Sequence, residues 1–328
     1  HDARPASEAT SKDAHSLRPA PRVQMIHNVP WNIFVDPRML QNAIEFLPED
    51  SDIIQISFPK CGSHWVEQIT QLILNEGRSS ANYLEFVDRA PFLEFQGEAA
   101  FQGRPAPRTI RTHLPFDKLR FNNKAKYIYV ARNPLDCCVS CYHFVKALPE
   151  FGFQEGTFDD FISAFLRGDW GFGDFFDHVR SCVDRAREPN VFLVTYEEIA
   201  KDTAGTVLKL ARFLGEKYAR TLMDDVDILQ RVVYKSSVPF MKTILETRLD
   251  EVQALFMKNP EFPSTSLFVE TEATKPGSAK FNFVRKGKVG DWREHFSVEQ
   301  LRRMWSAIED KTKGLNIMNL WGLNTLVY

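Results

Sequence analysis

The amino-acid sequence predicts an α/β domain with a central parallel sheet flanked by helices. Short apolar segments of strand length alternate along the chain with amphipathic segments of helical length. The 328 residues are 44% apolar and 26% charged, which suits one large globular domain with its own core. The alternation is typical of strand-helix-strand units, in which helices cover both faces of a parallel sheet.

The strand candidates are short and rich in Ile, Val and Tyr: Asp52–Phe58, Arg108–Thr112, Lys126–Val130 and Val191–Thr195. The helix candidates repeat apolar side chains every three or four residues: Trp65–Leu74, Leu135–Phe144, Phe158–Leu166, Phe175–Arg187, Thr203–Leu214 and Val298–Ile308. The segment Thr243–Ala279 has weak periodicity, which predicts long loops over a site.

The first 22 residues, His1 to Arg22, are rich in Ala, Ser, Pro and charge and have no periodicity. They predict a flexible arm, residues 1–22, ahead of a folded domain at 23–328. They also lack the apolar stretch of a signal peptide, and no apolar run approaches the roughly 20 residues that span a bilayer. We therefore expect a cytoplasmic protein that is not bound to membrane.

The net charge is close to zero, with 41 Lys plus Arg against 43 Asp plus Glu. No global field attracts a polyanion, so nucleic acid is not an expected partner. Any phosphate or sulfate site must be a local cluster of cations.

Five cysteines form an odd set without the spacing of a small secreted scaffold, so free thiols are expected. Cys138-Val-Ser-Cys141 matches a C-x-x-C pattern. Since no second pair and no His at ligand spacing accompany it, we interpret these cysteines as small buried residues of a helix, with a redox pair as the alternative. Cys61 differs: beside Lys60 at a helix start, it predicts a stabilised, redox-sensitive thiolate.

The segment Ser57 to Trp65, SFPKCGSHW, runs from the first strand candidate directly into a helix. A strand, a tight turn with Gly and Lys, and a helix N-terminus form a cradle for phosphate, because free backbone N–H groups converge on the anion. The alternative is an ordinary turn with a surface lysine. Lys60 precedes Gly62, so the segment is not a Walker A motif.

Two further cation clusters follow. The strand Tyr127 to Val130 ends in Ala131-Arg132, where a P-loop NTPase has the Asp that holds magnesium, and Ser140 lies on the next helix. The planar guanidinium of Arg132 suits a second, metal-free phosphate contact, with a salt-bridged surface arginine as the alternative. Arg285-Lys286-Gly287-Lys288 is the third cluster. Three separated clusters suit a nucleotide that carries phosphates at two ends.

In order and separation these motifs resemble those of the cytosolic sulfotransferase family. The Lys60 loop is similar to the family's 5′-phosphosulfate loop. The segment from Tyr127 to Ser140, YIYVARNPLDCCVS, is similar to its 3′-phosphate motif. The segment from Phe283 to Trp292, FVRKGKVGDW, is similar to its C-terminal signature. The resemblance extends from about Val23 to the C-terminal region. It implies a P-loop nucleotide-kinase-like α/β domain that transfers the sulfonate of 3′-phosphoadenosine 5′-phosphosulfate (PAPS) to a small molecule and releases 3′-phosphoadenosine 5′-phosphate (PAP), without a metal.

The resemblance assigns nucleotide contacts to three regions. They are Lys60, Cys61, Gly62, Ser63, His64 and Trp65 at the 5′ end; Arg132, Ser140, Arg285, Lys286 and Gly287 at the 3′-phosphate; and Tyr196 and Ser236 at the adenine. Three positions depart from the family pattern, because Cys61 stands for the usual Ser, His64 for a common Thr and Ser236 for a usual Thr.

The segment Arg111-Thr112-His113 ends a strand candidate. A lone histidine is more often structural, but the resemblance makes His113 the catalytic one. With an ordinary pKa of about 6.5 its imidazole would take a proton from an attacking hydroxyl near neutral pH. Lys60 would neutralise charge on the leaving phosphate oxygen. Arg111 replaces a family lysine and keeps the charge, which predicts an active enzyme with an altered sulfonate contact.

Most of the 27 phenylalanines must belong to the core. Pro91-Phe92-Leu93-Glu94-Phe95, however, matches a family segment whose two phenylalanines line the acceptor site. Together with His113, we expect Phe34, Phe92, Phe95 and Phe144 to bind the acceptor. Aromatic walls favour a phenol or catecholamine over a sugar. Glu150 is a candidate contact for an amine-bearing phenol, with a solvated loop glutamate as the alternative.

Two other functions remain open. A nucleotide kinase is disfavoured because the Gly-Lys-Ser/Thr order is missing, while Arg111 and His64 leave room for a non-catalytic PAPS- or PAP-binding protein.

For assembly, Arg293 to Arg302 resembles the family's dimer motif, Lys-x-x-x-Thr-Val-x-x-x-Glu, except that Arg302 replaces the final Glu. A two-fold contact would set Arg302 against the partner's Arg293, so we expect a monomer, or a dimer through another surface.

Overall fold

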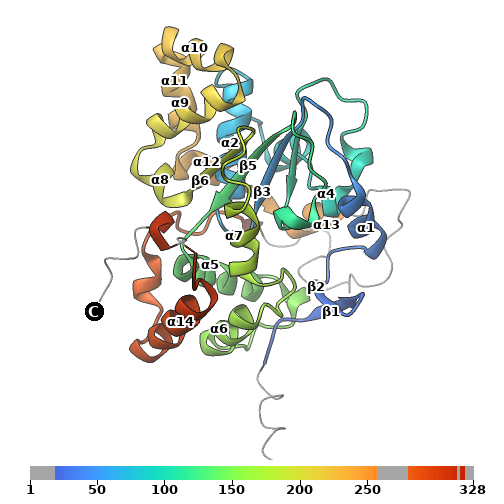
Figure 1. Ribbon diagram of the computed structural model, residues 1–328, viewed down its shortest axis with the longest axis vertical. Coiled ribbons are helices and arrows are strands. Elements are labelled where there is room, and N and C mark those ends of the chain that lie inside the picture. The colour runs from blue at the N-terminus through green and yellow to red at the C-terminus, as the bar shows by residue number, and fades with distance from the viewer. Residues whose placement is uncertain (1–18, 257–279, 316–317, 322–328) are drawn as a thin grey trace, which may run out of the picture.

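A computed structural model describes residues 19–256, 280–315 and 318–321 (Figure 1). At its centre is a four-stranded sheet in the order β4-β3-β5-β6, and every neighbouring pair is parallel. The strands are β3 (Ile53–Ser57), β4 (Thr109–Thr112), β5 (Lys126–Ala131) and β6 (Val191–Thr195). All four were predicted from the sequence to within one residue at each end. Because they are parallel, their carboxyl ends meet at one edge of the sheet.

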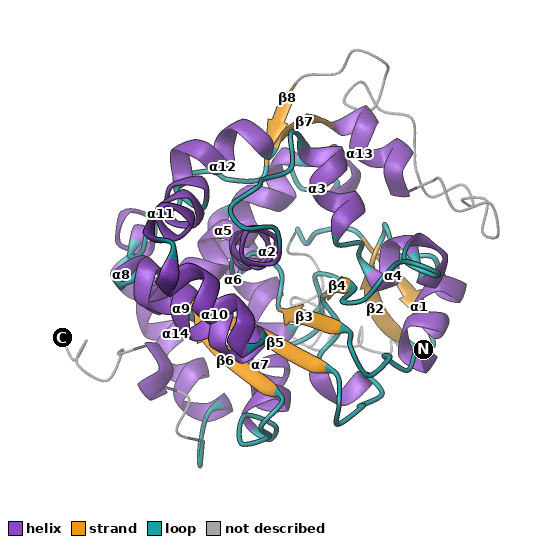
Figure 2. Ribbon diagram, turned by 90° about the horizontal axis from the view of Figure 1, so that it is seen from above, coloured by secondary structure: helices purple, strands orange, loops and turns teal. Residues whose placement is uncertain are grey.

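Helices cover both faces of this sheet, as the side-chain alternation of the strands requires (Figure 2). Ile53 and Ile128 pack on the side of α2 (Ser63–Leu74), α9 (Thr203–Leu214), α10 (Glu216–Asp224) and α11 (Val226–Lys235). Ile54 and Tyr129 pack on the opposite side, with α1 (Pro37–Glu45), α4 (Leu93–Gln96) and α7 (Phe175–Val183).

A third apolar cluster joins α5 (Pro134–Ala147), α6 (Phe158–Arg167), α7 and α14 (Val298–Lys311). In Figure 1, α5, α6 and α14 lie at the opposite end of the molecule from α9, α10 and α11. Every helix predicted above is present, which confirms the single α/β domain with a parallel sheet.

The smaller elements surround this framework. They are the antiparallel pair β1 (Val23–Ile26) and β2 (Val29–Asn32), the helices α3 (Tyr83–Arg89), α8 (Tyr196–Lys201), α12 (Val238–Ile244) and α13 (Leu249–Phe256), the antiparallel pair β7 (Glu246–Arg248) and β8 (Lys280–Asn282), and short 3-10 turns at Glu98–Ala100, Phe116–Lys118, Pro149–Phe151, Asp291–Glu294 and Met318–Trp321.

The expectation of loops over Thr243–Ala279 is wrong at its start, since α12 ends within it and β7 and α13 follow. A three-residue strand is too short to show periodicity, and it pairs with β8, whose residues lie far along the chain. Residues 257–279 lie outside the described residues, as do residues 1–18 of the predicted arm. Among the described residues, the first regular element begins at Val23. The division into an arm at 1–22 and a domain at 23–328 stays a prediction.

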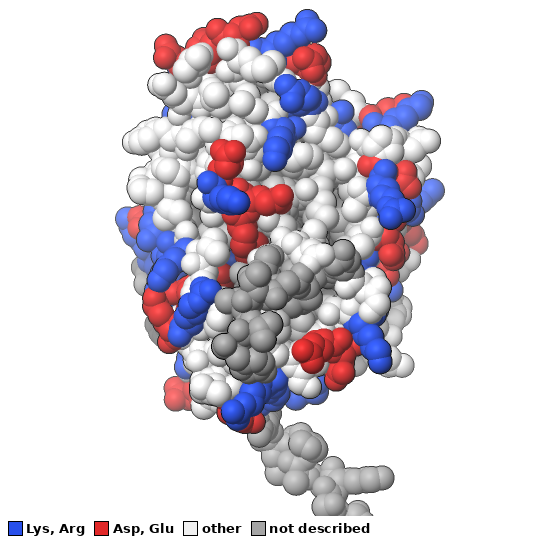
Figure 3. Space-filling view, turned by 60° about the vertical axis from the view of Figure 1, so that its left-hand side comes forward, with Lys and Arg blue, Asp and Glu red and all other residues white. Residues whose placement is uncertain are grey.

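Charges of both signs alternate on the face shown in Figure 3, in keeping with the small net charge. No described helix is long and apolar enough to cross a bilayer. All five cysteines are free, as predicted, and all five are buried.

Candidate active site

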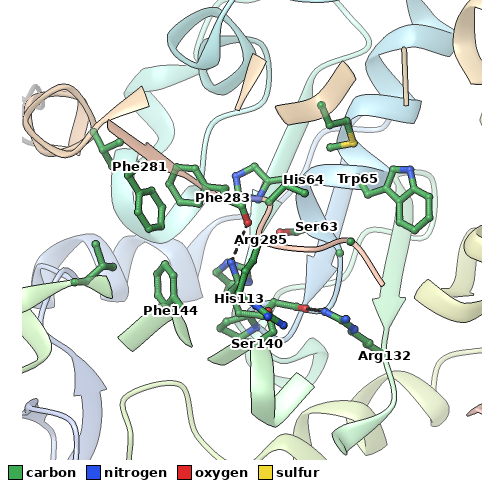
Figure 4. Close-up of a pocket in the computed structure, with 18 of the residues that line it drawn as sticks. Ser63, His64, Trp65, His113, Arg132, Ser140, Phe144, Phe281, Phe283 and Arg285 are labelled. Carbon is green, nitrogen blue, oxygen red and sulfur yellow. Dashed lines mark hydrogen bonds between the residues drawn. The ribbon is translucent and has the colours of Figure 1, made fainter. Parts of the chain in front are cut away.

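One pocket lies at the carboxyl edge of the sheet, where the four parallel strands end. Lys60 follows β3, His113 follows β4, Arg132 follows β5 and Tyr196 follows β6, and all four side chains line it. Strand β3 has β4 on one side and β5 on the other, so the chain reverses its direction across the sheet there. In open α/β sheets such a switch point is the usual place for a ligand. In Figure 4 the rings of Phe144, Phe281 and Phe283 lie on one side of the pocket and Arg132 on the other.

The loop between β3 and α2 has the predicted cradle form. Gly62 precedes α2 with φ +106°, and a Cβ there would lie 2.8 Å from Cδ2 of Tyr196, so only glycine fits both the backbone and the space. Lys60 also has a positive φ, of 67°. No side chain caps the N-terminus of α2, so its first N–H groups are available to an anion.

Lys60 is the cation at the centre of the pocket. Its Nζ lies 4.9 Å from the ring centroid of Phe144 and donates to the carbonyl of Phe283 at 3.4 Å. Burial, together with the positive charges of Arg132 and Arg285, lowers the pKa of Lys60 to about 8. A bound anion would reverse this effect, because it stabilises the ammonium form.

Arg132 joins two phosphate motifs. Its guanidinium donates to the carbonyls of Lys60 and Lys288, both at 3.2 Å, and stacks 4.3 Å from the ring centroid of Tyr196. The side chain is buried, its guanidinium hydrogen bonds go to carbonyls, and its Nε has no partner in the described part of the chain. The alternative of a salt-bridged surface arginine is therefore wrong, and the positive charge remains available to a ligand.

The third cluster, in contrast, is paired with acids of its own loop. Arg285 and Lys286 bind Asp291, while Glu294 binds Lys286 at 2.9 Å and Lys288 at 2.7 Å. Burial acts against ionisation of Asp291, yet its bonds to Arg285 and Lys286 lower its pKa to about 2. A phosphate in this loop would compete with carboxylates for the same cations.

Asp136, on α5, anchors that loop to the helix. Its Oδ2 accepts from the N–H of Gly290 at 2.7 Å and its Oδ1 from the N–H of Trp292 at 3.0 Å, while Asn133 Nδ2 also donates to Oδ2 at 2.9 Å. The side chain is 1% exposed. Sequence reasoning did not assign Asp136 a role, because its partners in the loop, Gly290 and Trp292, lie 154 and 156 positions away.

We expect Asp136→Asn to loosen this loop and to lower the free energy of unfolding by about 2–3 kcal/mol, because the amide keeps one oxygen but turns its NH₂ towards the N–H of Gly290 or of Trp292, which leaves that N–H buried and unsatisfied. The dissociation constant for PAP should rise with it. Urea unfolding and titration calorimetry measure the two effects. Asp310→Asn, an exposed position on α14, is the control and should change stability by less than about 0.5 kcal/mol. A D136N protein as stable as D310N would refute the anchoring role.

His113 is held from several directions. Its Nδ1 lies 2.8 Å from the carbonyl of Ser57, which can only accept, so Nδ1 carries the proton and Nε2 keeps a lone pair. The backbone N–H of His113 donates to Glu94 Oε1 at 2.7 Å, and its carbonyl lies 3.1 Å from Nε2 of His178. Tyr129 Oη lies 2.7 Å from Nδ1 of that histidine. This arrangement fixes the tautomer that a general base needs.

The expectation of an ordinary pKa for His113 is wrong. Burial lowers it to about 3, although the Ser57 carbonyl raises it, and the charges of His178, Arg111 and Lys60 lower it further. The imidazole is therefore neutral across the physiological range and able to accept a proton. A bound polyanionic nucleotide would raise its basicity by offsetting the surrounding positive charge.

All four phenylalanines assigned to the acceptor, Phe34, Phe92, Phe95 and Phe144, line the pocket. Phe92 lies 4.9 Å from the His113 ring centroid. Sequence reasoning missed Phe172, Phe281 and Phe283, which line it as well. The alternation Phe281-Asn282-Phe283 was the signal for the last two, since residues two apart in an extended segment share a face, although β8 itself ends at Asn282.

The structure brings most predicted nucleotide contacts to the pocket wall: Lys60, Gly62, Ser63, His64, Trp65, Arg132, Ser140, Tyr196, Arg285, Lys286 and Gly287. Ser236 is not among the lining residues. It is 1% exposed, and its hydroxyl donates to the carbonyl of Val233 at 3.0 Å. Its predicted contact with the adenine has no support in this geometry.

Arg111 lies behind the pocket instead of in its wall. It is fully buried, its Nε donates to the carbonyl of Ala90 at 2.7 Å, and its guanidinium carbon lies 4.2 Å from the ring centroid of Phe92. Its charge still acts on the site, because it is one cause of the lowered pKa of His113. A direct sulfonate contact for Arg111 stays a prediction.

Cys61 also lies outside the wall, with its Sγ 3.7 Å from Sγ of Cys137. Burial raises the pKa of the Cys61 thiol well above its ordinary value. The expected stabilised thiolate is therefore wrong, because the side chain is buried in the apolar cluster that includes Cys137 of α5.

Glu94 is a further residue that sequence reasoning missed. It is 2% exposed, and burial is the main cause that raises its pKa to about 7. A lone acid inside the apolar run from Pro91 to Phe95 was the available signal.

The pocket suits a large polar ligand. Four of its residues carry a buried nitrogen without a hydrogen-bond partner among the described residues: Nε2 of His64, Nε1 of Trp65, Nε of Arg132 and Nε of Arg285. Buried polar atoms in proteins are normally satisfied, so such a group around one cavity indicates a missing partner. Glycines at 62 and 287 both have positive φ, and a Cβ there would meet the side chains of Tyr196 and Val238, so these two turns of the pocket wall require glycine.

The family model described as Sulfotransferase domain matches residues 50–316. The chain therefore belongs to the sulfotransferase family, and the resemblance given above is confirmed.

Curated relatives extend over nearly the whole chain. The amine sulfotransferase of the rabbit, Oryctolagus cuniculus, is 30% identical over 88% of this chain and 90% of its own length. The 3-alpha-hydroxysteroid sulfotransferase of the guinea pig, Cavia porcellus, is 32% identical over 88% of this chain and 96% of its own length. Among solved structures, a mouse sulfotransferase in complex with PAP has a TM-score of 0.65 at 22% identity, over 90% of this chain and 96% of that one.

Proposed function

We propose that this protein transfers the sulfonate of PAPS to the hydroxyl of a small aromatic acceptor such as a phenol or catecholamine. One observation carries the proposal: a neutral imidazole, His113, lies in one pocket with the cations Lys60 and Arg132, which donate to backbone carbonyls, and with phenylalanine rings. The neutral imidazole suits proton abstraction. The cations suit a nucleotide with two phosphate ends, and the phenylalanine rings suit a flat apolar acceptor.

The nucleotide would lie along the carboxyl edge of the sheet. Lys60, the N–H groups at Ser63 and His64, and Arg132 would hold the 5′ end, while Arg285, Lys286 and Ser140 would hold the 3′-phosphate. Trp65 and Tyr196, whose ring centroids are 4.8 Å apart, offer an aromatic surface for the adenine. Bound PAPS would supply the sulfonate.

His113 would take the hydroxyl proton at Nε2 while its Nδ1–H stays on the Ser57 carbonyl. The acceptor oxygen forms its bond to sulfur as the sulfur-oxygen bond to the 5′-phosphate breaks, and Lys60 neutralises the negative charge that develops on the leaving phosphate oxygen. We propose that Lys60 and Arg132 supply the electrostatic stabilisation for which a kinase uses magnesium, so the reaction should proceed in chelator.

A test separates this function from its rivals. The protein is incubated with radiolabelled PAPS and a panel of phenols, catecholamines, amines and sterols, with and without EDTA, while PAP binding is measured by calorimetry. Transfer that survives EDTA supports the proposal. Binding of PAP without transfer to any acceptor would instead identify a sequestering protein, and phosphoryl transfer from ATP would identify a kinase.

We also predict that the protein does not dimerise through the C-terminal segment Arg293 to Arg302. Val298 is 67% exposed there, and Arg302 pairs with Glu299 of its own helix at 3.3 Å. In a two-fold contact through this segment, Arg293 and Arg302 would face each other with like charge.

Sedimentation at micromolar concentration tests this, and wild type should behave as Val298→Glu does. A wild-type dimer that Val298→Glu dissociates would refute the prediction, whereas dimerisation only of Arg302→Glu would support it.

A further inference from the structure

Helix α7 holds the loop that carries His113 at two points. Nε2 of His178 lies 3.1 Å from the carbonyl oxygen of His113, and the hydroxyl of Ser181, one turn further along the helix, accepts from the N–H of Phe116 at 2.9 Å. The same hydroxyl donates to the carbonyl of His178 at 2.7 Å, so one network joins the two contacts. His178 is 1% exposed, and it is not among the described residues that line the pocket.

The surroundings of His178 determine which of its nitrogens carries the proton. The carbonyl of His113 can only accept, so Nε2 is protonated and Nδ1 keeps a lone pair. The hydroxyl of Tyr129, on β5, lies 2.7 Å from that Nδ1 and supplies the donor. If the hydroxyl donated instead to the carbonyl of His178, 3.0 Å away, a neutral ring would turn an Nε2 lone pair towards the His113 carbonyl. Burial lowers the pKa of His178 to about 4, so the ring is neutral at physiological pH.

Three elements of the fold thus fix the position of His113. Its backbone N–H is held by Glu94 on α4, and its carbonyl by His178 on α7. Its Nδ1–H is held by the carbonyl of Ser57, at the end of β3. The two backbone contacts set the direction in which the side chain leaves the chain, and the third sets the rotation of the ring. Without the contact to α7 the imidazole would shift, and a displacement of about 1 Å at a reacting group can cost about 100-fold in rate.

We propose that His178 is a positioning residue for sulfonate transfer: its Nε2–H holds the backbone of His113, so that Nε2 of His113 stays directed at the acceptor hydroxyl. The proposal rests on the function proposed above, in which His113 takes the hydroxyl proton. Since His178 is not one of the described pocket residues, neither nucleotide nor acceptor would touch it. Its loss should therefore slow the chemical step and leave the binding of both ligands nearly unchanged.

Three substitutions on α7 separate positioning from packing. His178→Phe removes the donor but keeps an aromatic ring against Phe58, whose ring centroid lies 5.5 Å from that of His178. His178→Gln replaces the donor with an amide N–H that can reach the same carbonyl. Val179→Ala, at the next residue of the helix, is the control, because it removes buried atoms from the apolar cluster shared with α5, α6 and α14 and keeps the donor.

We expect H178F to lower the single-turnover rate of transfer, measured at saturating PAPS and acceptor, about 10- to 100-fold. The dissociation constant for PAP and the KM for the acceptor should change by less than about threefold. H178Q should recover most of the lost rate. V179A should unfold at a lower urea concentration than wild type, yet keep the rate within about twofold.

A rate in H178F within about threefold of wild type would overturn the proposal. A parallel loss of PAP affinity, or an equal loss of rate in V179A, would also overturn it, because His178 would then only maintain the packing of α7. If H178F does not fold, Tyr129→Phe carries the test, since it removes the hydrogen bond to Nδ1 and leaves the His178 ring in place. Y129F should slow transfer about three- to tenfold, and a wild-type rate would overturn the proposal. Failure of wild type to transfer sulfonate, or a wild-type rate in H113A, would count against the proposed function itself.

Discussion

Replacing His113 with alanine is expected to lower kcat at least about 100-fold while PAP binding is retained, because general bases typically contribute 10²- to 10⁴-fold. The structure gives the imidazole the form that this role requires. Its Nδ1–H is held by the Ser57 carbonyl at 2.8 Å, and its pKa of about 3 keeps it neutral at any pH where the protein would work. It carries no positive charge, so its removal takes no cation from the nucleotide site.

Rate assays and calorimetry with PAP separate these two effects. His27→Ala, at an exposed position before β2, is the control and should behave as wild type in both. An H113A protein that keeps more than about a hundredth of the wild-type kcat would show that another group accepts the proton. Loss of PAP affinity equal to the loss of rate would instead assign His113 to binding.

The sequence predicted the sheet and the main helices because their signals are local. A run such as Ile53–Ser57 is apolar throughout, and the helix after it repeats apolar residues along one face, so each element can be recognised without its neighbours. The short strands β7 and β8 carry no such signal. They exist because Thr247 pairs with Phe281, a contact between distant segments that periodicity does not contain.

For the candidate site too, local sequence signals predicted some residues and long-range contacts determine the others. The Lys60 loop and the Arg285 to Lys288 cluster were predicted because each is contiguous in the sequence. The roles of Glu94, which accepts from the N–H of His113, and of Asp136, which accepts from the N–H of Gly290, were not predicted. Each role depends on folding that brings separate segments into contact.

The pKa values of His113 and Cys61 show a further property that the sequence alone did not predict. An ordinary pKa for His113 and a lowered one for Cys61 follow from residue type and neighbours in the chain, but burial dominates both and moves each pKa away from that expectation. Burial is a property of the whole fold. For the same reason the sequence could not show that Arg111 lies behind Phe92 and outside the pocket wall.

Lys60 provides the second large effect, since Lys60→Met should lower kcat by about 10²- to 10³-fold through the loss of charge stabilisation at the leaving oxygen. In the wild-type protein, the Lys60 side chain should also make nucleotide binding depend on pH. Burial and the charges of Arg132 and Arg285 lower the pKa of Lys60 to about 8 in the free protein. Below pH 8 the ammonium is already present, whereas above it the free protein has lost the charge that an anionic ligand needs.

A bound nucleotide raises the pKa of Lys60, because the anion favours the charged form. Binding must therefore take up a proton between pH 8 and the higher pKa of the complex, and the dissociation constant for PAP should rise by up to tenfold for each pH unit in that window. Calorimetry between pH 7 and 9.5, in pairs of buffers with different ionisation enthalpies, measures both the affinity and the proton uptake. Lys60→Arg keeps its charge throughout, so its affinity should not change between pH 8 and 9.5 and it should take up no proton there. The same pH dependence in wild type and K60R would show that another group titrates, and Lys60 would then not be the cation that the nucleotide requires.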